Sequence, residues 1–110
     1  MPQIYNFRDH IKGNTFPGVT FTILINGLPW DLTGAVISMQ LRKITGSTNV
    51  FELSTTNGRI AITNPTEGIF AIIEQIIDIE AYNYYYDIII ILPSGIVKTY
   101  ITGRWNILSD

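Results

Sequence analysis

The chain has 110 residues, a formal net charge of −2 and no cysteine. Disulfides and thiolate metal sites are therefore excluded, and the scattered basic residues argue against a nucleic-acid-binding surface. A hydrophobic fraction of 46% with only 15% charged residues predicts one folded domain over residues 1–110. The apolar run Ile88–Leu92 is too short to cross a bilayer, and the first residues lack the pattern of a signal peptide. We expect no membrane partner and synthesis in the cytoplasm.

The chain in order shows short alternating segments between turns. Val19–Ile25 and Ala35–Arg42 alternate apolar with polar residues, and Asn26-Gly27 and Asn57-Gly58 are predicted tight turns. Turn signals recur roughly every eight to twelve residues, a spacing typical of sandwiches and barrels. The pattern predicts an all-β protein, an immunoglobulin-like antiparallel β-sandwich of seven or eight strands, with a small closed barrel as the alternative.

The segment Tyr82–Leu92, "YNYYYDIIIIL", is the predicted central strand, because aromatic and β-branched residues fit a buried pleated surface. Its core face is predicted to carry Tyr84, Tyr86, Ile88 and Ile90. Its first tyrosines suggest a tyrosine corner. The preceding segment, Glu74–Asn83, is predicted to cross between the sheets. In the last strand, from Val97 to Ile107, Gly103 is predicted to mark a bulge or kink.

One charged residue is unusual, because Asp87 lies between Tyr86 and four isoleucines. A buried carboxylate needs a hydrogen-bond or charge partner. Two interpretations are open: an ion pair at an interface, or an edge-facing Asp held by a neighbouring basic residue. We favour the second, with Lys98 across the Pro93–Gly95 turn as the partner.

Residues for catalysis or cofactor binding are scarce. His10 is the only histidine and has no companions at metal-ligand spacing, so we expect neither a metal site nor a cofactor. Four carboxylates at outward or turn positions are interpreted as ordinary surface groups: Glu52, Glu67, Glu74 and Glu80. Trp105 has the parity of the core face. Trp30 lies in a turn-like segment and is the candidate for a sugar-binding platform.

A second apolar face is the most informative feature of the pattern. Its residues have the parity that points away from the sandwich core, and free monomers seldom expose such a surface. They are Ile69, Ala71, Ile73, Tyr85, Ile89, Ile91, Ile96 and Tyr100. Either this face is a subunit interface, or the Glu74–Asn83 segment, with Ile76, Ile77 and Ile79, folds over it. We favour the interface, because the patch is predicted to span neighbouring strands.

Three segments resemble virion proteins of tailed phages. They are "DLTGAVISMQLR" (Asp31–Arg42), "LSTTNGRIAITNPTEGIF" (Leu53–Phe70) and "YYYDIIIILPSGIVKTYITGRW" (Tyr84–Trp105). The nearest family is the N-terminal, immunoglobulin-like domain of phage baseplate upper proteins. Unlike that protein, this chain ends at Asp110 without the coiled coil and receptor-binding carrier portion. The resemblance carries over no catalytic residues.

The resemblance implies a non-enzymatic structural protein of the tail, baseplate, neck or fibre. Expected partners are other virion proteins and copies of the chain itself, in a virion assembled in the host cytoplasm. The loops Lys12–Gly18 and Thr45–Asn49 are expected to add specificity. The alternative is a carbohydrate-binding module that aids attachment to the host surface, with Trp30 as its platform. A small hydrolase is the least favoured interpretation.

Overall fold

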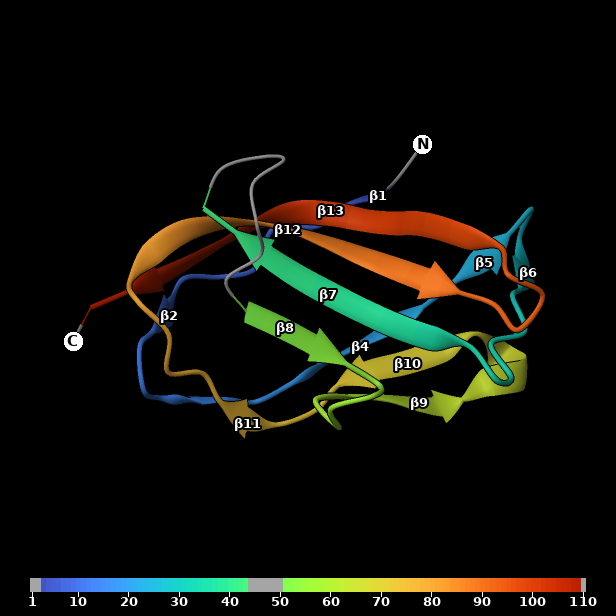
Figure 1. Ribbon diagram of the computed structural model, residues 1–110, viewed down its shortest axis with the longest axis horizontal. Coiled ribbons are helices and arrows are strands. Elements are labelled where there is room, and N and C mark those ends of the chain that lie inside the picture. The colour runs from blue at the N-terminus through green and yellow to red at the C-terminus, as the bar shows by residue number, and fades with distance from the viewer. Residues whose placement is uncertain (1–2, 44–50, 110) are drawn as a thin grey trace.

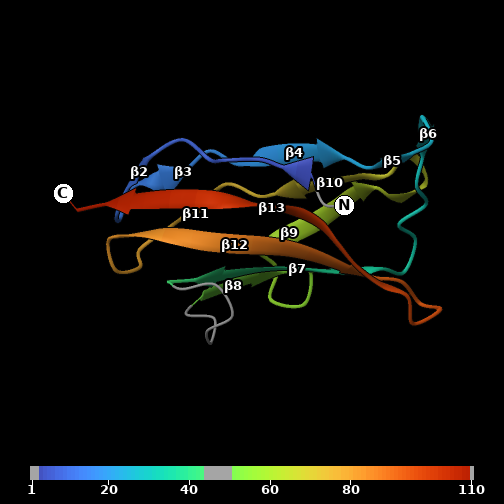
Figure 2. The ribbon, with the colours of Figure 1, turned by 90° about the horizontal axis from the view of Figure 1, so that it is seen from above.

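The computed structural model describes residues 3–43 and 51–109 as two packed layers of β-strands (Figures 1 and 2). The first layer is a six-stranded sheet in the order β1-β13-β12-β7-β8, with β2 also paired to β13. Its members are β1 (Gln3–Ile4), β2 (His10–Ile11), β7 (Val36–Arg42), β8 (Phe51–Ser54), β12 (Tyr82–Ile91) and β13 (Val97–Leu108). The long antiparallel pair β12–β13 forms the middle of this sheet.

The second layer is a three-stranded sheet in the order β4-β10-β9. Its strands are β4 (Val19–Thr22), β9 (Ile60–Asn64) and β10 (Ile69–Ile72), and a 3₁₀ turn, η1 (Pro65–Glu67), joins the last two. Two small pairs complete the layer: β3 (Thr15–Phe16) with β11 (Gln75–Ile76), and β5 (Leu24–Ile25) with β6 (Leu28–Pro29).

The prediction of an all-β sandwich is confirmed. Seven of the strands in the described ranges have four or more residues, close to the predicted number, and six more have only two. One difference is that β1 and β2 pair with β13 in parallel, although a wholly antiparallel arrangement was expected. The immunoglobulin-like strand order stays a prediction.

The core lies between the layers and contains the predicted face of the central strand. Tyr84, Tyr86, Ile88 and Ile90 are buried, and so is Trp105. Phe70 and Ile72 of β10 close the core from the other sheet. Each large side chain buried in this way stabilises the fold by about 1.5–3 kcal/mol relative to its exposed form.

The predicted tyrosine corner is present. The hydroxyl of Tyr84 donates a 2.6 Å hydrogen bond to the carbonyl oxygen of Glu80, four residues upstream. This bond fixes the entry into β12. Glu74–Asn83 does cross from one layer to the other, as predicted, and Ile77 from its middle is buried in the core.

Gly103 does not mark the irregularity of β13. It pairs in regular register with Tyr86, whereas the register shifts between Ile88 and Ile89, where Tyr100 is the extra residue. Gly103 lies instead where the N-terminal segment passes closest. A Cβ atom there would lie 2.0 Å from the carbonyl oxygen of Tyr5. The position therefore needs glycine for close backbone approach, which is the other common reason for glycine within a strand.

Candidate functional site

The predicted apolar patch is divided between the two outer faces of the sandwich. β10 pairs with β4 and β9, whereas β12 pairs with β7 and β13. The expectation that these residues lie on neighbouring strands is therefore wrong. Ile69, Ala71 and Ile73 follow the outward parity of β10, because Phe70 and Ile72 are buried. Their part in an interface stays a prediction, now for two separate surfaces.

The alternative, in which Glu74–Asn83 folds over the patch, does not match the structure either. Ile77 is buried in the core and Ile79 packs against it. Ile76 points to solvent, with 59% of its surface exposed. The apolar residues of this crossover segment thus contribute mainly to the interior.

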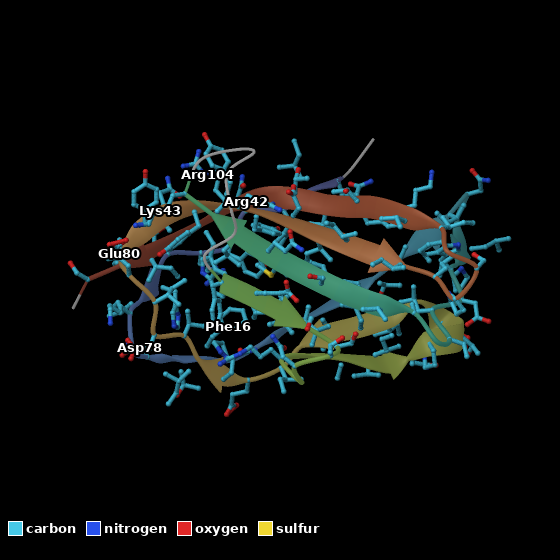
Figure 3. The ribbon with its side chains drawn as sticks, viewed as in Figure 1. Phe16, Arg42, Lys43, Asp78, Glu80 and Arg104 are labelled. Atoms are coloured by element: carbon cyan, nitrogen blue, oxygen red, sulfur yellow. The ribbon has the colours of Figure 1, made fainter. Side chains whose placement is uncertain are left out.

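The outer face of the six-stranded sheet is polar around Asp87. Arg42 lies on the neighbouring β7 and is labelled in Figure 3. It donates a 3.0 Å hydrogen bond to the Asp87 carboxylate and a second bond to Gln40. The predicted partner of Asp87, Lys98, is therefore wrong. Lys98 pairs with Ile90, which faces the core. Paired residues share a face of the sheet, so the Lys98 side chain lies on the face opposite to that of Asp87.

Tyr85, a predicted interface residue, is also part of this polar region. The Arg104 guanidinium lies over the Tyr85 ring, with 3.8 Å between its Cζ atom and the ring centroid. Arg104 also donates a hydrogen bond to the carbonyl oxygen of Asn83. One face of the Tyr85 ring is therefore already covered by a cation, in an arrangement that stabilises both groups.

The apolar part of the same outer face lies near the β12–β13 turn. Ile91 pairs with Val36 on one side and with Val97 on the other, so three aliphatic side chains lie in one row. All three are exposed, Val97 by 58%. Ile89, half-buried, pairs with Ser38 and Thr99. The sequence predicted Ile89 and Ile91. It missed the two valines, since their place beside Ile91 depends on strand register.

Two further predicted interface residues lie off this face. Ile96 is exposed in the turn before β13, and Tyr100 occupies the bulge. Tyr100 packs against Trp30, with ring centroids 4.9 Å apart, and this burial raises the pKa of its hydroxyl. Trp30 is itself half-buried against the core. A sugar would stack only on the part of the Trp30 ring that these contacts leave exposed.

A groove of about 680 Å³ opens beside these rings, between the edges of the two sheets. Its walls come from the first residues of the described chain, from Phe21–Ile25 and from Lys98–Ile101. Several of the apolar side chains at its rim are strongly exposed: Ile4 by 76% and Leu24 by 54%. In both ribbon views the β5–β6 hairpin and the β12–β13 turn lie at this end of the molecule (Figures 1 and 2).

The β13 edge beside the groove is covered over only part of its length. The N-terminal segment covers the stretch from Ile101 onward, through backbone bonds from Tyr5 to Thr102 and from Phe7 to Arg104. Val97–Tyr100 has no strand partner on that side among residues 3–43 and 51–109. The Leu92 N–H donates a hydrogen bond to the Ile96 carbonyl oxygen. Because successive residues of an antiparallel pair alternate between bonding toward and away from the partner strand, the N–H and C=O groups of Val97 and Thr99 point away from β12.

The histidine and the glutamates considered for catalysis or metal binding do not form a common site. The Nε2 atom of His10 is 2.9 Å from the carbonyl oxygen of Asn14, and its ring packs edge-on against Phe16. Glu52, Glu67, Glu74 and Glu80 are exposed. Among the described residues, no three His, Asp or Glu side chains gather as a metal site would need, and no helix is long and apolar enough to span a membrane.

Of the two loops expected to add specificity, the structure describes only the first. Part of Lys12–Gly18 lies in β3, and Lys12 forms a 2.6 Å ion pair with Asp78 of the crossover segment. Thr45–Asn49 lies outside the described residues. Compared with models of known protein families, the chain matches none, and a comparison with curated proteins also gives no match.

Proposed function

We propose that the chain is a non-enzymatic structural protein of a tailed-phage particle that acts by docking to other virion proteins. The observation that supports this proposal best is the apolar groove between the sheet edges, with its strongly exposed rim. Ile4, Leu24 and Val97 are each more than half exposed at this end of the molecule. Burial of apolar surface contributes about 25 cal/mol per Å² of favourable free energy, so covering these side chains would favour binding of a partner there.

The resemblance of Asp31–Arg42, Leu53–Phe70 and Tyr84–Trp105 to phage baseplate upper proteins directs the proposal to a virion. In such a particle one domain contacts several neighbours, so more than one surface is used. The sandwich offers three that are distinct: the groove, the outer face at Ile89 and Ile91, and the outer face at Ile69 and Ile73. Copies of the chain are proposed as partners on the two outer faces.

The location in a particle is tested with an antibody against the chain. Particles are purified by density gradient from the host strain that carries the gene, then probed by immunoblot and by immunogold electron microscopy. The proposal expects the chain to co-sediment with intact particles and gold to label one defined place on them. A chain that stays wholly in the lysate fraction, with an abundant host protein as the reference, would contradict it.

Self-association is tested separately for the two outer faces. Ile73→Lys changes the three-stranded sheet and Ile89→Lys changes the six-stranded sheet, so each variant reports on one surface. Light scattering after size exclusion is expected to show an oligomer that one of the two substitutions dissociates. A wild-type chain that is monomeric at all concentrations would refute the self-assembly part and leave docking to other proteins standing.

A further inference from the structure

We infer that the open edge of β13 takes up an extended segment of a partner protein as an added β-strand. This inference rests on the proposed docking function and names the class of partner for the groove. The occupant is a strand with apolar residues at alternate positions and at least one acidic residue. Its backbone pairs with Val97–Tyr100, and its apolar side chains enter the groove.

The backbone of this edge supplies the pairing groups. Val97 and Thr99 each direct an N–H and a C=O away from β12, as the alternation set by the Leu92–Ile96 bond requires. These two residues are exposed, and no described strand pairs with them on that side. Four unpaired ladder groups in a row on a sheet edge are the template that an added strand uses.

The groove supplies the side-chain specificity. Successive residues of a strand point to opposite faces, so every second side chain of the occupant would point between the two sheets. There it meets Phe21, Ile23 and Leu24 on one wall, and Tyr100 and Ile101 on the other. These walls are apolar, which favours valine, isoleucine or an aromatic residue at the alternate positions.

The charge of the lining favours an acidic occupant. Among the described residues that line the groove, Lys98 is the single charged one. It is exposed, and within the described part of the chain it forms no ion pair. A carboxylate on the added strand would complement this ammonium group. The gain at such a rim position lies more in orientation and association rate than in affinity.

A partner segment fits the edge better than a second copy of β13. Two-fold antiparallel pairing of Val97–Tyr100 with its own copy would place the copy's Ile101 and Thr102 beside the Pro93–Ile96 turn. Those residues already carry β1 on the same side, so each β1 would meet the other copy's turn. Gly95 at φ 93° bends the chain away there and offers no strand for pairing. A peptide with free ends avoids this conflict.

The test starts from a displayed library of random peptides of about nine residues, a typical strand length, selected on the immobilised full chain. The inference expects enriched peptides that alternate apolar residues and carry an acid. Synthetic copies of them should slow hydrogen exchange at the Val97 and Thr99 amides. Enrichment of no peptide, or binding that leaves both amides unchanged, would overturn the inference.

Three variants make the result specific. Thr99→Pro removes one edge N–H, and Leu24→Lys places a charge in the groove wall; each should weaken binding about tenfold or more, the worth of one good hydrogen bond or apolar contact. Leu28→Lys is the matched control. Leu28 lies in the same hairpin and is 69% exposed, but it does not line the groove, so binding should not change. Binding that survives both Thr99→Pro and Leu24→Lys would overturn the inference.

A second copy is excluded by the same readout without peptide. If exchange at Val97 and Thr99 slows as the protein concentration rises, and light scattering shows a dimer, the occupant is another copy and the inference of a partner strand fails. The proposed function is judged independently by the particle immunoblot. A chain found in particles whose β13 edge binds no peptide would keep its virion role and lose only this docking mode.

Discussion

The two edges of the six-stranded sheet are protected in different ways. At the β8 edge, Asn57 accepts a 3.0 Å hydrogen bond from the Ser54 N–H and donates a 2.9 Å bond to the Glu52 carbonyl. One side chain of the adjacent turn thus occupies the groups that a foreign strand would use. At the β13 edge the N-terminal segment covers the stretch from Ile101 onward, and no strand among the described residues pairs with Val97–Tyr100 on that side.

This difference distinguishes the edge that we propose for strand addition from the edge that is closed to it. Exposed edges risk aggregation, and proteins usually blunt them. The β8 edge is short and capped by its own turn, while Arg59 lies over the Phe51 ring. Among the described residues, neither a capping turn side chain nor a covering arginine lies at Val97–Tyr100 of β13, and this stretch borders an apolar groove. An edge left open beside a groove is what a docking strand requires.

The largest expected effect comes from Gly103→Ala, which disturbs the covered part of the β13 edge. The new methyl group would meet the Tyr5 carbonyl at 2.0 Å, so the N-terminal segment must move away from β13. Forced overpacking of this kind costs about 1–3 kcal/mol or more of unfolding free energy. Urea unfolding measures the loss, and faster hydrogen exchange at Tyr5 and Phe7 locates it.

Thr99→Ala, on the open part of the same strand, is the control for Gly103→Ala. It should change stability by less than about 0.5 kcal/mol, as exposed substitutions usually do. If Gly103→Ala were as stable as Thr99→Ala and kept slow exchange at Tyr5, the N-terminal segment would not be the cover that we describe.

The next largest effect is expected for Asn57→Ala, which opens the β8 edge. It leaves the Ser54 N–H and the Glu52 carbonyl without their side-chain partner, at a cost of about 1–2 kcal/mol. Association at high concentration should rise, because the edge becomes available. Asn57→Asp is the matched control. It keeps the acceptor for Ser54, so it should cost less, and an equal loss in both variants would contradict the capping role.

The sequence predicted much of this fold because burial imposes a period of two on each strand. Alternation assigned both faces of Tyr82–Ile91 correctly, and the tyrosines at its start indicated the corner bond of Tyr84. Alternation does not say which sheet a strand joins. The pattern therefore predicts one shared surface for Ile69 and Ile89, whereas their strands lie in different layers.

Register was the second property that local pattern could not supply. Because Tyr100 is an extra residue in the bulge, the positions before it shift relative to β12. Neither the pairing of Lys98 with Ile90 nor the pairing of Asp87 with Gln40 could be read from spacing alone. The place of the groove follows from the register of β1, which pairs Gln3 with Ile101. No local residue pattern predicts that register.

A smaller effect is expected for Tyr86→Phe, which removes a hydrogen bond that holds the N-terminal segment against the β13 edge. The buried Tyr86 hydroxyl donates a hydrogen bond to the Tyr5 carbonyl. Its loss should lower the free energy of unfolding by about 1 kcal/mol, and it should speed exchange at Tyr5 more than in the middle of β12. Tyr82→Phe, at an exposed position, is the control and should change neither quantity.

The same tyrosines predict loss of stability in alkali. Burial raises the pKa of Tyr84 and, more strongly, that of Tyr86. The folded state thus favours the neutral phenols. Their contribution is fully present below the unfolded pKa of about 10 and is lost as pH rises above it. Urea unfolding between neutral pH and pH ~11 should show this decline, and it should be shallower in Tyr86→Phe. An equal slope in both proteins would contradict the assignment.

The smallest expected effect, and the sharpest test of the open edge, is Thr99→Pro. Proline is tolerated on an edge strand when its missing N–H faces solvent. Since the Thr99 N–H points away from β12 and has no described strand opposite, the free energy of unfolding should change by no more than about 0.5 kcal/mol.

The neighbouring substitution Lys98→Pro is the matched control. Lys98 pairs with Ile90, and the ladder alternation directs its N–H toward β12. Proline there breaks a bond of the central pair and should cost about 1–3 kcal/mol. Thermal and urea unfolding compare the stability of the two variants, whose substitutions lie at adjacent, exposed residues. If both were equally destabilised, Thr99 would have a backbone partner, and the β13 edge would be as closed as the β8 edge.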